Sequence, residues 1–232
     1  MQLIQAISSA RPERTQECVL TAPLGTTRLV ATLDDPRDAI RNGEAYPRSH
    51  SYTYRIANIQ ICLTAGLIIL NELSESSSEL QKLFVFENAF ERIFNLIQAE
   101  GSLNQGGIVV QDCLSLLANL VRYNASNQTT FRETGGVARF AALLPGGQKG
   151  KKPKAATEED EWTSPQKDKN IWGLLAILRM FLVKGSTSTL PNQNAFQKHG
   201  LLQQALNIAF DKSTTIPIKV EVSIVLASHG QH

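Results

Sequence analysis

The feature that most constrains the fold is a repeated segment of ten residues. Residues 126–135 read SNQTTFRETG and residues 191–200 read PNQNAFQKHG, so Phe131 aligns with Phe196 at an offset of 65 residues and both copies end in glycine. Each copy is expected to form a short helix that stops at its glycine. Because recurrence over such a distance is the signature of stacked helical units, it predicts a solenoid.

An apolar helix is predicted directly after each short helix. Two copies follow the repeated segments, at residues 137–144 and 201–209, and two fainter copies lie upstream at residues 26–33 and 90–97. The repeats are offset by 64, 47 and 65 residues. Since helical repeats of the armadillo type are about 40–47 residues long, two of the units carry roughly 20 extra residues each.

A third, longer helix is expected between these pairs. It is clearest at residues 107–123, where apolar side chains recur with the period of a buried helical stripe, and residues 171–184 supply a second copy. Three helices per unit, one of them short and ended by glycine, is the armadillo arrangement. The sequence therefore predicts an all-α fold, an armadillo/HEAT-like right-handed α-solenoid of about four repeats.

The extra residues fall in two segments of different character. Residues 145–165 contain a basic block followed by an acidic block and are expected to form a flexible charged loop. Residues 43–65 show no helical stripe in their first half and contain Pro47, so we expect them to be extruded, with the interrupted helix restarting near Gly66. The final residues, 222–232, do not resemble a repeat helix and form a divergent tail.

Composition excludes several classes of function. Lys plus Arg outnumber Asp plus Glu by 23 to 21, so charge gives no reason to expect binding to nucleic acid. The three cysteines are far apart without CxxC spacing, which argues against a zinc site or a disulfide framework. The longest apolar runs, 61–70 and 174–183, are about half of the ~20 residues that a membrane span needs. With no secretory signal in the first residues, we expect a cytoplasmic protein with reduced thiols and no transmembrane segment.

No catalytic or cofactor-binding motif is present. The four histidines have no cysteine or carboxylate at the spacing of a metal site or catalytic triad, and no phosphate-binding loop or nucleophile motif occurs. We therefore predict that the chain is not an enzyme and binds no cofactor. Armadillo arrays bind extended partners through Asn and charged side chains on a concave face, which makes Asn119, Arg122 and Arg139 the candidate partner-binding residues. A plain solvated face remains the alternative for all three.

Five strings of residues together resemble one family. Residues 86–94 (FENAFERIF), 106–114 (GGIVVQDCL), 126–131 (SNQTTF), 162–167 (WTSPQK) and 199–204 (HGLLQQ) resemble the armadillo-like head of the general vesicular transport factors, the Uso-type Golgi tethers. The resemblance covers residues 1–221, which are identified as a fragment of such a head. Residues 43–65 and 222–232 depart from it, and we interpret both as foreign segments of the kind that translated intron produces.

The resemblance implies a function and a set of partners. Such tethers promote docking of vesicles before membrane fusion, in transport from the endoplasmic reticulum to the Golgi and within the Golgi. Their implied partners are Rab-family GTPases, golgins, SNAREs and the conserved oligomeric Golgi complex. The parent is implied to be a homodimer with a coiled coil, cytoplasmic and peripherally associated with Golgi and transport-vesicle membranes.

A generic armadillo peptide-binding adaptor of the nuclear-import or adhesion type is the alternative function. Such an adaptor would show Trp and Asn recurring at one helix position in successive repeats. In this sequence Asn119 aligns with Glu72 at the 47-residue offset, and Trp172 has no counterpart. The groove chemistry therefore favours the tether head.

Overall fold

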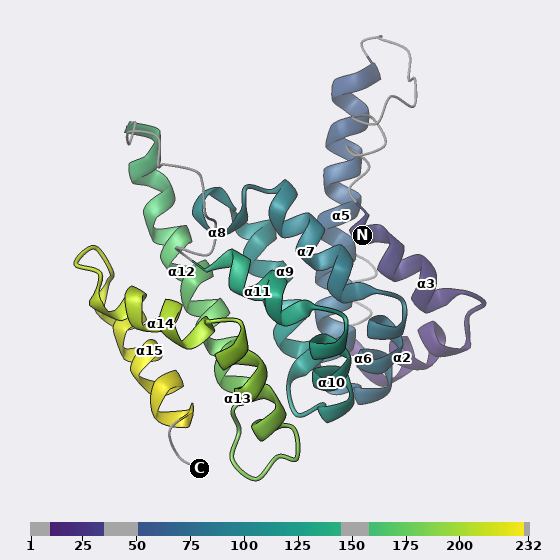
Figure 1. The fold of residues 1–232 in the computed structure, drawn as a ribbon. Helices are drawn as coiled ribbons and strands as arrows, with labels where there is room; N and C mark the ends of the chain where they lie inside the picture. The colour runs from purple at the N-terminus through teal and green to yellow at the C-terminus, as the bar shows by residue number, and fades with distance from the viewer. Residues whose placement is uncertain (1–9, 35–50, 145–157, 230–232) are drawn as a thin grey trace. The chain divides into compact units, whose positions relative to one another are not determined.

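The computed structural model describes residues 10–34, 51–144 and 158–229, and every regular element in these ranges is a helix. The prediction of an all-α fold is confirmed. The chain divides into two compact units, Met1–Ala99 and Glu100–His232. Figure 1 shows the order of the helices from purple at the amino terminus to yellow at the carboxyl terminus.

The first unit is built around one long helix. Its elements are α2 (Pro12–Thr21), α3 (Gly25–Val30), the 3-10 turn η1 (Ala31–Leu33), α5 (Ser51–Ser76), α6 (Ser78–Phe86) and α7 (Ala89–Ala99). Helix α5 contacts α2, α3, η1 and α6, and its leucines at 67, 70 and 73 recur at helical spacing and are fully buried. Burial of this stripe, rather than helix propensity alone, holds the long helix in place.

The helices of the second unit are α8 (Ser102–Gln105), α9 (Ile108–Val121), α10 (Ala125–Glu133), α11 (Gly136–Leu143), α12 (Glu158–Met180), α13 (Thr189–Lys198), α14 (Leu201–Phe210) and α15 (Ile216–His229). In this unit, successive helices pack against one another, with α12 between α9 and α15. The long helix α12 packs against both α9 and α15, as Figure 1 shows, while the short α10 packs against α13. Helices α9, α12 and α15 thus form one layer, of which the repeat pattern predicts the first two members.

The junction between the short helix and the apolar helix recurs four times. A residue with positive φ precedes each apolar helix: Leu24 (57°), Asn88 (63°), Gly135 (77°) and Gly200 (71°). These positions are separated by 64, 47 and 65 residues, the same offsets that the sequence pattern gives. The four-repeat prediction is therefore confirmed at the level of the backbone.

The left-handed junction gives a first testable prediction. A Cβ added at Gly200 would meet no atom within 4 Å, so replacing it with alanine tests the backbone conformation alone. We expect Gly200→Ala to lower the free energy of unfolding by about 1–2 kcal/mol, because φ of 71° is unfavourable for a residue with a Cβ. Urea denaturation followed by circular dichroism measures the change.

The natural non-glycine junction at Asn88 supplies the matched control. Asn88→Gly removes a Cβ at the same kind of position and is expected to leave stability unchanged or raise it by up to about 1 kcal/mol. A Gly200→Ala variant as stable as the parent chain would show that the junction tolerates a side chain at no cost.

Three expectations about local structure are wrong. The first concerns helix α5, which begins at Ser51, not near Gly66, and Leu63 within the supposed insertion is buried. The physical reason is that Pro47 precedes the helix instead of interrupting it, so the helix avoids the cost of an internal proline. Residues 43–50 lie outside the described residues, and the foreign origin of 43–65 stays a prediction.

The charged loop is shorter than predicted, and most of the segment predicted as a tail is helical, whereas its foreign origin stays a prediction. Helix α12 begins at Glu158, in an acidic stretch of a kind that is favourable in the first turn of a helix. Only residues 145–157 remain of the expected loop, and these lie outside the described residues. Helix α15 runs to His229, and Val222 and Val225 are buried in the unit. The sequence pattern hid this helix because its apolar residues lie on two faces, with exposed members at positions 216, 220 and 224.

None of the helices in the described ranges combines the length and the apolar character that a membrane span requires.

Candidate functional site

Two buried amide side chains join the carboxyl ends of α9 and α12. Gln128 Nε2 on α10 donates hydrogen bonds to the Val121 carbonyl, 2.9 Å away, and to the Met180 carbonyl, 3.4 Å away. Val121 is the last residue of α9 and Met180 is the last residue of α12. One amide group therefore fixes the distance between the ends of two successive long helices.

A second amide extends this network to the next repeat. Asn192 Nδ2 on α13 donates to the Phe181 carbonyl at 2.7 Å and to Gln128 Oε1 at 2.9 Å, and Asn192 Oδ1 accepts a hydrogen bond from Arg132. Asn192 is completely buried. Since the last carbonyls of a helix have no partner within the helix, these amides satisfy groups that would otherwise be buried and unpaired.

The same arrangement occurs in the first unit. Gln81 Nε2 donates to the Ser74 carbonyl at 2.7 Å, and Gln81 and Ser74 each lie 47 residues before Gln128 and Val121. A hydrogen bond from a glutamine amide to a carbonyl in the last turn of the preceding long helix thus recurs in two repeats.

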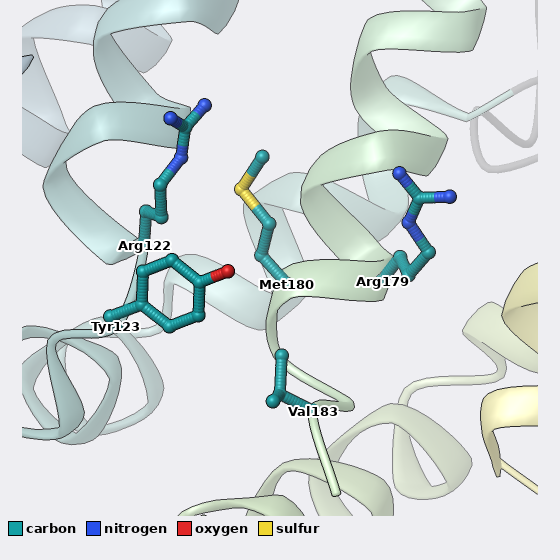
Figure 2. A pocket seen from close by; sticks show the side chains of 5 residues that line it. All are labelled: Arg122, Tyr123, Arg179, Met180 and Val183. Atoms are coloured by element: carbon teal, nitrogen blue, oxygen red, sulfur yellow. The ribbon is translucent and has the colours of Figure 1, made fainter.

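A pocket of about 280 Å³ opens over the joined helix ends of the second unit. It is lined by Arg122, Tyr123, Arg179, Met180 and Val183 (Figure 2). Arg122 and Tyr123 follow α9 directly, whereas the other three residues come from the last turn of α12 and the segment after it. The pocket therefore combines two guanidinium groups and a phenol with the apolar surface of Met180 and Val183.

The two arginines differ in their surroundings. Arg122 is exposed and makes no ion pair among the residues that the structure describes. Arg179 is partly exposed, and its Nη1 lies 3.4 Å from Oε1 of Glu221, a residue of α15 that is only 4% exposed. The Glu221 carboxylate balances part of the charge of Arg179 and orients its side chain, so the pocket keeps an excess of positive charge.

Tyr123 occupies a strained backbone position. Its φ is 52°, and 86% of its surface is exposed. A left-handed conformation costs a non-glycine residue about 1–2 kcal/mol, and burial of the ring returns nothing here because the ring faces solvent. Tyr123 comes directly after the C-cap of α9, where a left-handed residue commonly ends a helix, and this backbone turn places the exposed ring in the lining of the pocket.

Comparison with known proteins finds relatives along nearly the whole chain. No family model matches it. The yeast "Intracellular protein transport protein USO1" from Saccharomyces cerevisiae is 32% identical over 228 residues, which is 98% of this chain and 11% of that protein. Human "General vesicular transport factor p115" is 31% identical over 95% of this chain and 19% of that protein. The crystal structure of Uso1-2 superposes with a TM-score of 0.78 and 28% identity, covering 98% of this chain and 29% of that one.

The chain is a homologue of the Uso1/p115 vesicular transport factors. It spans between a tenth and a fifth of the length of these relatives. The shared fold confirms the armadillo-like solenoid, and the resemblance to Uso-type tethers is confirmed.

In this Uso1/p115 homologue, one of the three candidate residues lines the pocket. Arg122 does, whereas Asn119 lies half-buried on α9 and Arg139 half-buried on α11, and neither lines it. Sequence reasoning missed the remaining lining residues. The signal that could have found them was Arg179, a charged residue that interrupts an otherwise apolar helix.

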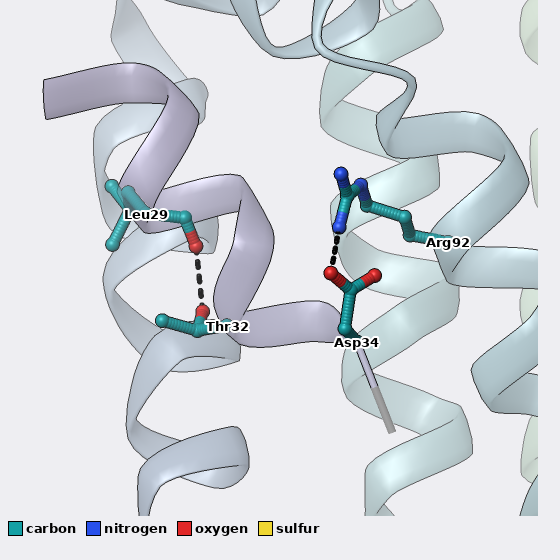
Figure 3. Close-up of polar contacts among 4 residues, drawn as sticks. All are labelled: Leu29, Thr32, Asp34 and Arg92. Carbon is teal, nitrogen blue, oxygen red and sulfur yellow. Dashed lines mark hydrogen bonds and ion pairs between the residues drawn. The ribbon is translucent and has the colours of Figure 1, made fainter. Parts of the chain in front are cut away.

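The repeat position of Arg139 has a structural role elsewhere in the chain. Arg92, which lies 47 residues earlier, forms an ion pair with Asp34 in the first unit (Figure 3). Asp34 follows η1, where the Thr32 hydroxyl donates to the Leu29 carbonyl at 2.6 Å. Because Arg92 forms an ion pair within its own unit, a structural role is favoured for Arg139, which occupies the same position of the repeat.

Two titratable groups of the described residues, Asp112 and Cys113, lie together on α9. Burial raises the pKa of the Cys113 thiol far above its ordinary value, so the thiol stays protonated and unreactive. Burial also raises the pKa of Asp112 beside it on α9. Among the described residues, no group of three or more His, Cys, Asp or Glu side chains gathers as metal ligands do.

Proposed function

We propose that this chain is part of the head of a vesicle-tethering factor and acts as a protein-binding scaffold. In this role it promotes docking of vesicles before fusion, in transport from the endoplasmic reticulum to the Golgi and within the Golgi. The observation that carries the proposal is the similarity along 98% of the chain to a relative named as an intracellular protein transport protein, together with the shared fold.

The second unit supports a scaffold role on physical grounds. Its long helices are joined at their ends by buried amides, so surface side chains such as Arg122 and Tyr123 are held on a firm base. Preorganised side chains lose less conformational entropy when a partner binds, which raises affinity without further contacts. A binding surface of this type does not require catalysis.

Partners and location are proposed from the resemblance. The proposed partners are a Rab-family GTPase, golgins, SNAREs and the conserved oligomeric Golgi complex, and the proposed parent is a homodimer. The proposed location is cytoplasmic, at the surface of Golgi and transport-vesicle membranes. We propose that the chain has no catalytic activity, which is supported by relatives that are named as transport factors.

A chimera tests the proposed function. The segment of Saccharomyces cerevisiae USO1 that matches this chain would be replaced by residues 1–232, and the chimera supplied to cells from which the natural protein is depleted. We expect transport of a secreted reporter from the endoplasmic reticulum to the Golgi to continue, because fold and sequence agree along the matched segment. Processing of the reporter's sugars measures transport.

The matched control carries an armadillo segment of the same length from a nuclear-import receptor. If both chimeras support transport, the segment serves as a spacer and the proposed scaffold function is wrong. If the chimera with residues 1–232 is expressed and folded but transport stops, the proposal is equally wrong.

A further inference from the structure

The pocket at the ends of α9 and α12 carries positive charge, although the carboxyl ends of helices are themselves partly negative. Helix carboxyl ends carry partial negative charge on their unpaired carbonyl groups, which repels anions. Here the carbonyls of Val121, Met180 and Phe181 all accept hydrogen bonds from Gln128 or Asn192. Because these amides occupy the carbonyls, the arginine side chains decide the charge of the pocket.

The lining favours an anion that has an apolar neighbour. Arg122 and Arg179 present guanidinium groups, whose planar donors match a carboxylate. Met180 and Val183 add apolar surface between and below them, and the Tyr123 ring stands beside Arg122 (Figure 2). A group that pairs with the arginines therefore brings its neighbours against apolar side chains.

The size of the pocket favours a side chain over a larger ligand. Its volume of about 280 Å³ lies at the lower limit of small-molecule sites, which run from roughly 300 to 1,000 Å³. Two arginines also provide far less charge than a membrane surface needs, because lipid-binding patches use about four to eight basic residues. The pocket thus suits one or two side chains of a protein segment.

We propose that this pocket binds an acidic side chain in an extended segment of a partner protein, with a neighbouring apolar side chain of that segment lying on Met180 and Val183. The proposal rests on the proposed scaffold function and names the chemistry of one of its partners. Arg122 forms the ion pair with the acid, and Arg179, held by Glu221, donates the second set of hydrogen bonds. Recognition of acidic motifs by arginine side chains is an established mode of peptide binding.

A peptide array tests the proposal on the purified full chain. The array carries peptides in which Glu or Asp stands next to Leu or Phe in every order, and a matched array carries Gln and Asn in place of the acids. We expect the chain to bind acidic peptides and to ignore their amide counterparts. Arg122→Ala should weaken the best peptide roughly tenfold or more, as loss of a charged hydrogen bond does.

Lys184→Ala is the matched control. Lys184 is an exposed cation directly after the pocket residue Val183 but does not line the pocket. We expect this variant to bind within about twofold of the parent chain, because exposed charges outside a contact contribute little. Since Arg122 is exposed, its variant is expected to melt at the parent temperature, which circular dichroism verifies.

Three results would overturn the proposal. Equal losses in the Arg122→Ala and Lys184→Ala variants would mean diffuse attraction between the chain and the acidic peptides. Failure of the acidic array to bind overturns it as well, and so does an Arg122→Ala variant that binds as well as the parent chain.

A vesicle-binding assay distinguishes anionic lipid from an acidic protein side chain as the ligand of the pocket. Vesicles of phosphatidylcholine alone are compared with vesicles of equal parts phosphatidylcholine and phosphatidylserine in flotation assays. Binding to the anionic vesicles that Arg122→Ala abolishes, without binding to acidic peptides, would assign the pocket to lipid and overturn the proposal. If the chain binds acidic peptides but the USO1 chimera does not support transport, only the proposed function is wrong. If the chimera supports transport but the chain binds no acidic peptide, only the proposed pocket ligand is wrong.

Discussion

Replacing Phe181 with alanine is expected to destabilise the second unit strongly. The Phe181 ring is buried between Phe131, with ring centroids 5.0 Å apart, and Phe196, at 5.5 Å. The change removes about 3–5 kcal/mol of burial and packing, to which the two ring contacts contribute. We expect a loss of about 4 kcal/mol in the free energy of unfolding, measured by urea denaturation, and a fall in melting temperature of roughly 10 °C.

Phe210→Ala is the control in the same unit. Phe210 ends α14 and is 82% exposed, so its removal should change stability by less than about 0.5 kcal/mol. If the two variants lost similar stability, the stack of rings at 131, 181 and 196 would not be the centre of this core.

Asn192→Ala carries the second largest expected effect. The substitution removes hydrogen bonds to the Phe181 carbonyl and Gln128 Oε1 and takes away the acceptor of Arg132 Nη1, while Arg132 Nη2 keeps its bond to the Thr129 hydroxyl. Because these groups are buried or partly buried, the loss includes the cost of leaving them unpaired, and we expect about 3 kcal/mol. Thermal and urea denaturation of the purified chain measure it.

The neighbouring Asn194 provides the matched control, since it lies on the same helix and is exposed. Asn194→Ala should change stability by less than about 0.5 kcal/mol. A double-mutant cycle with Gln128→Ala adds a sharper test. The two losses are expected to be less than additive, with an interaction energy of roughly 0.5–3 kcal/mol, because Gln128 and Asn192 share one network. Strict additivity would contradict the network.

Sequence patterns predicted the repeat but not all of its boundaries. Phe131 and Phe196, each followed four residues later by glycine, located two junctions, and the fainter copies of the apolar helix at 90–97 and 26–33 lay next to the other two, Asn88 and Leu24. The sequence does not reveal the beginning of α5, because a proline four residues before a helix has the same pattern as a proline that interrupts one. Most of α15 has the pattern of a divergent tail, because periodicity detects a helix only when its apolar residues share one face.

The pocket was only partly predictable. Arg122 stood out as a polar residue at the end of a periodic helix, whereas Met180 and Val183 looked like ordinary core residues of α12. Beneath the pocket, Gln128 bridges the ends of α9 and α12 through main-chain carbonyls. Main-chain acceptors are present at every residue, so no side-chain pattern marks which of them will be used. The repeated Asn-Gln pair at 127–128 and 192–193 was visible, but its role depends on which carbonyls the fold brings within reach.

That use of main-chain acceptors bears on how such a surface evolves. The hydrogen bonds that join successive repeats use the side-chain amides of Gln128 and Asn192 and main-chain carbonyl groups, which any amino acid would supply. Mutations at Arg122, Tyr123 or Val183 can therefore alter what the pocket recognises while these hydrogen bonds stay intact. Lineages that diverge to about 30% identity can in this way retain one scaffold and exchange its partners.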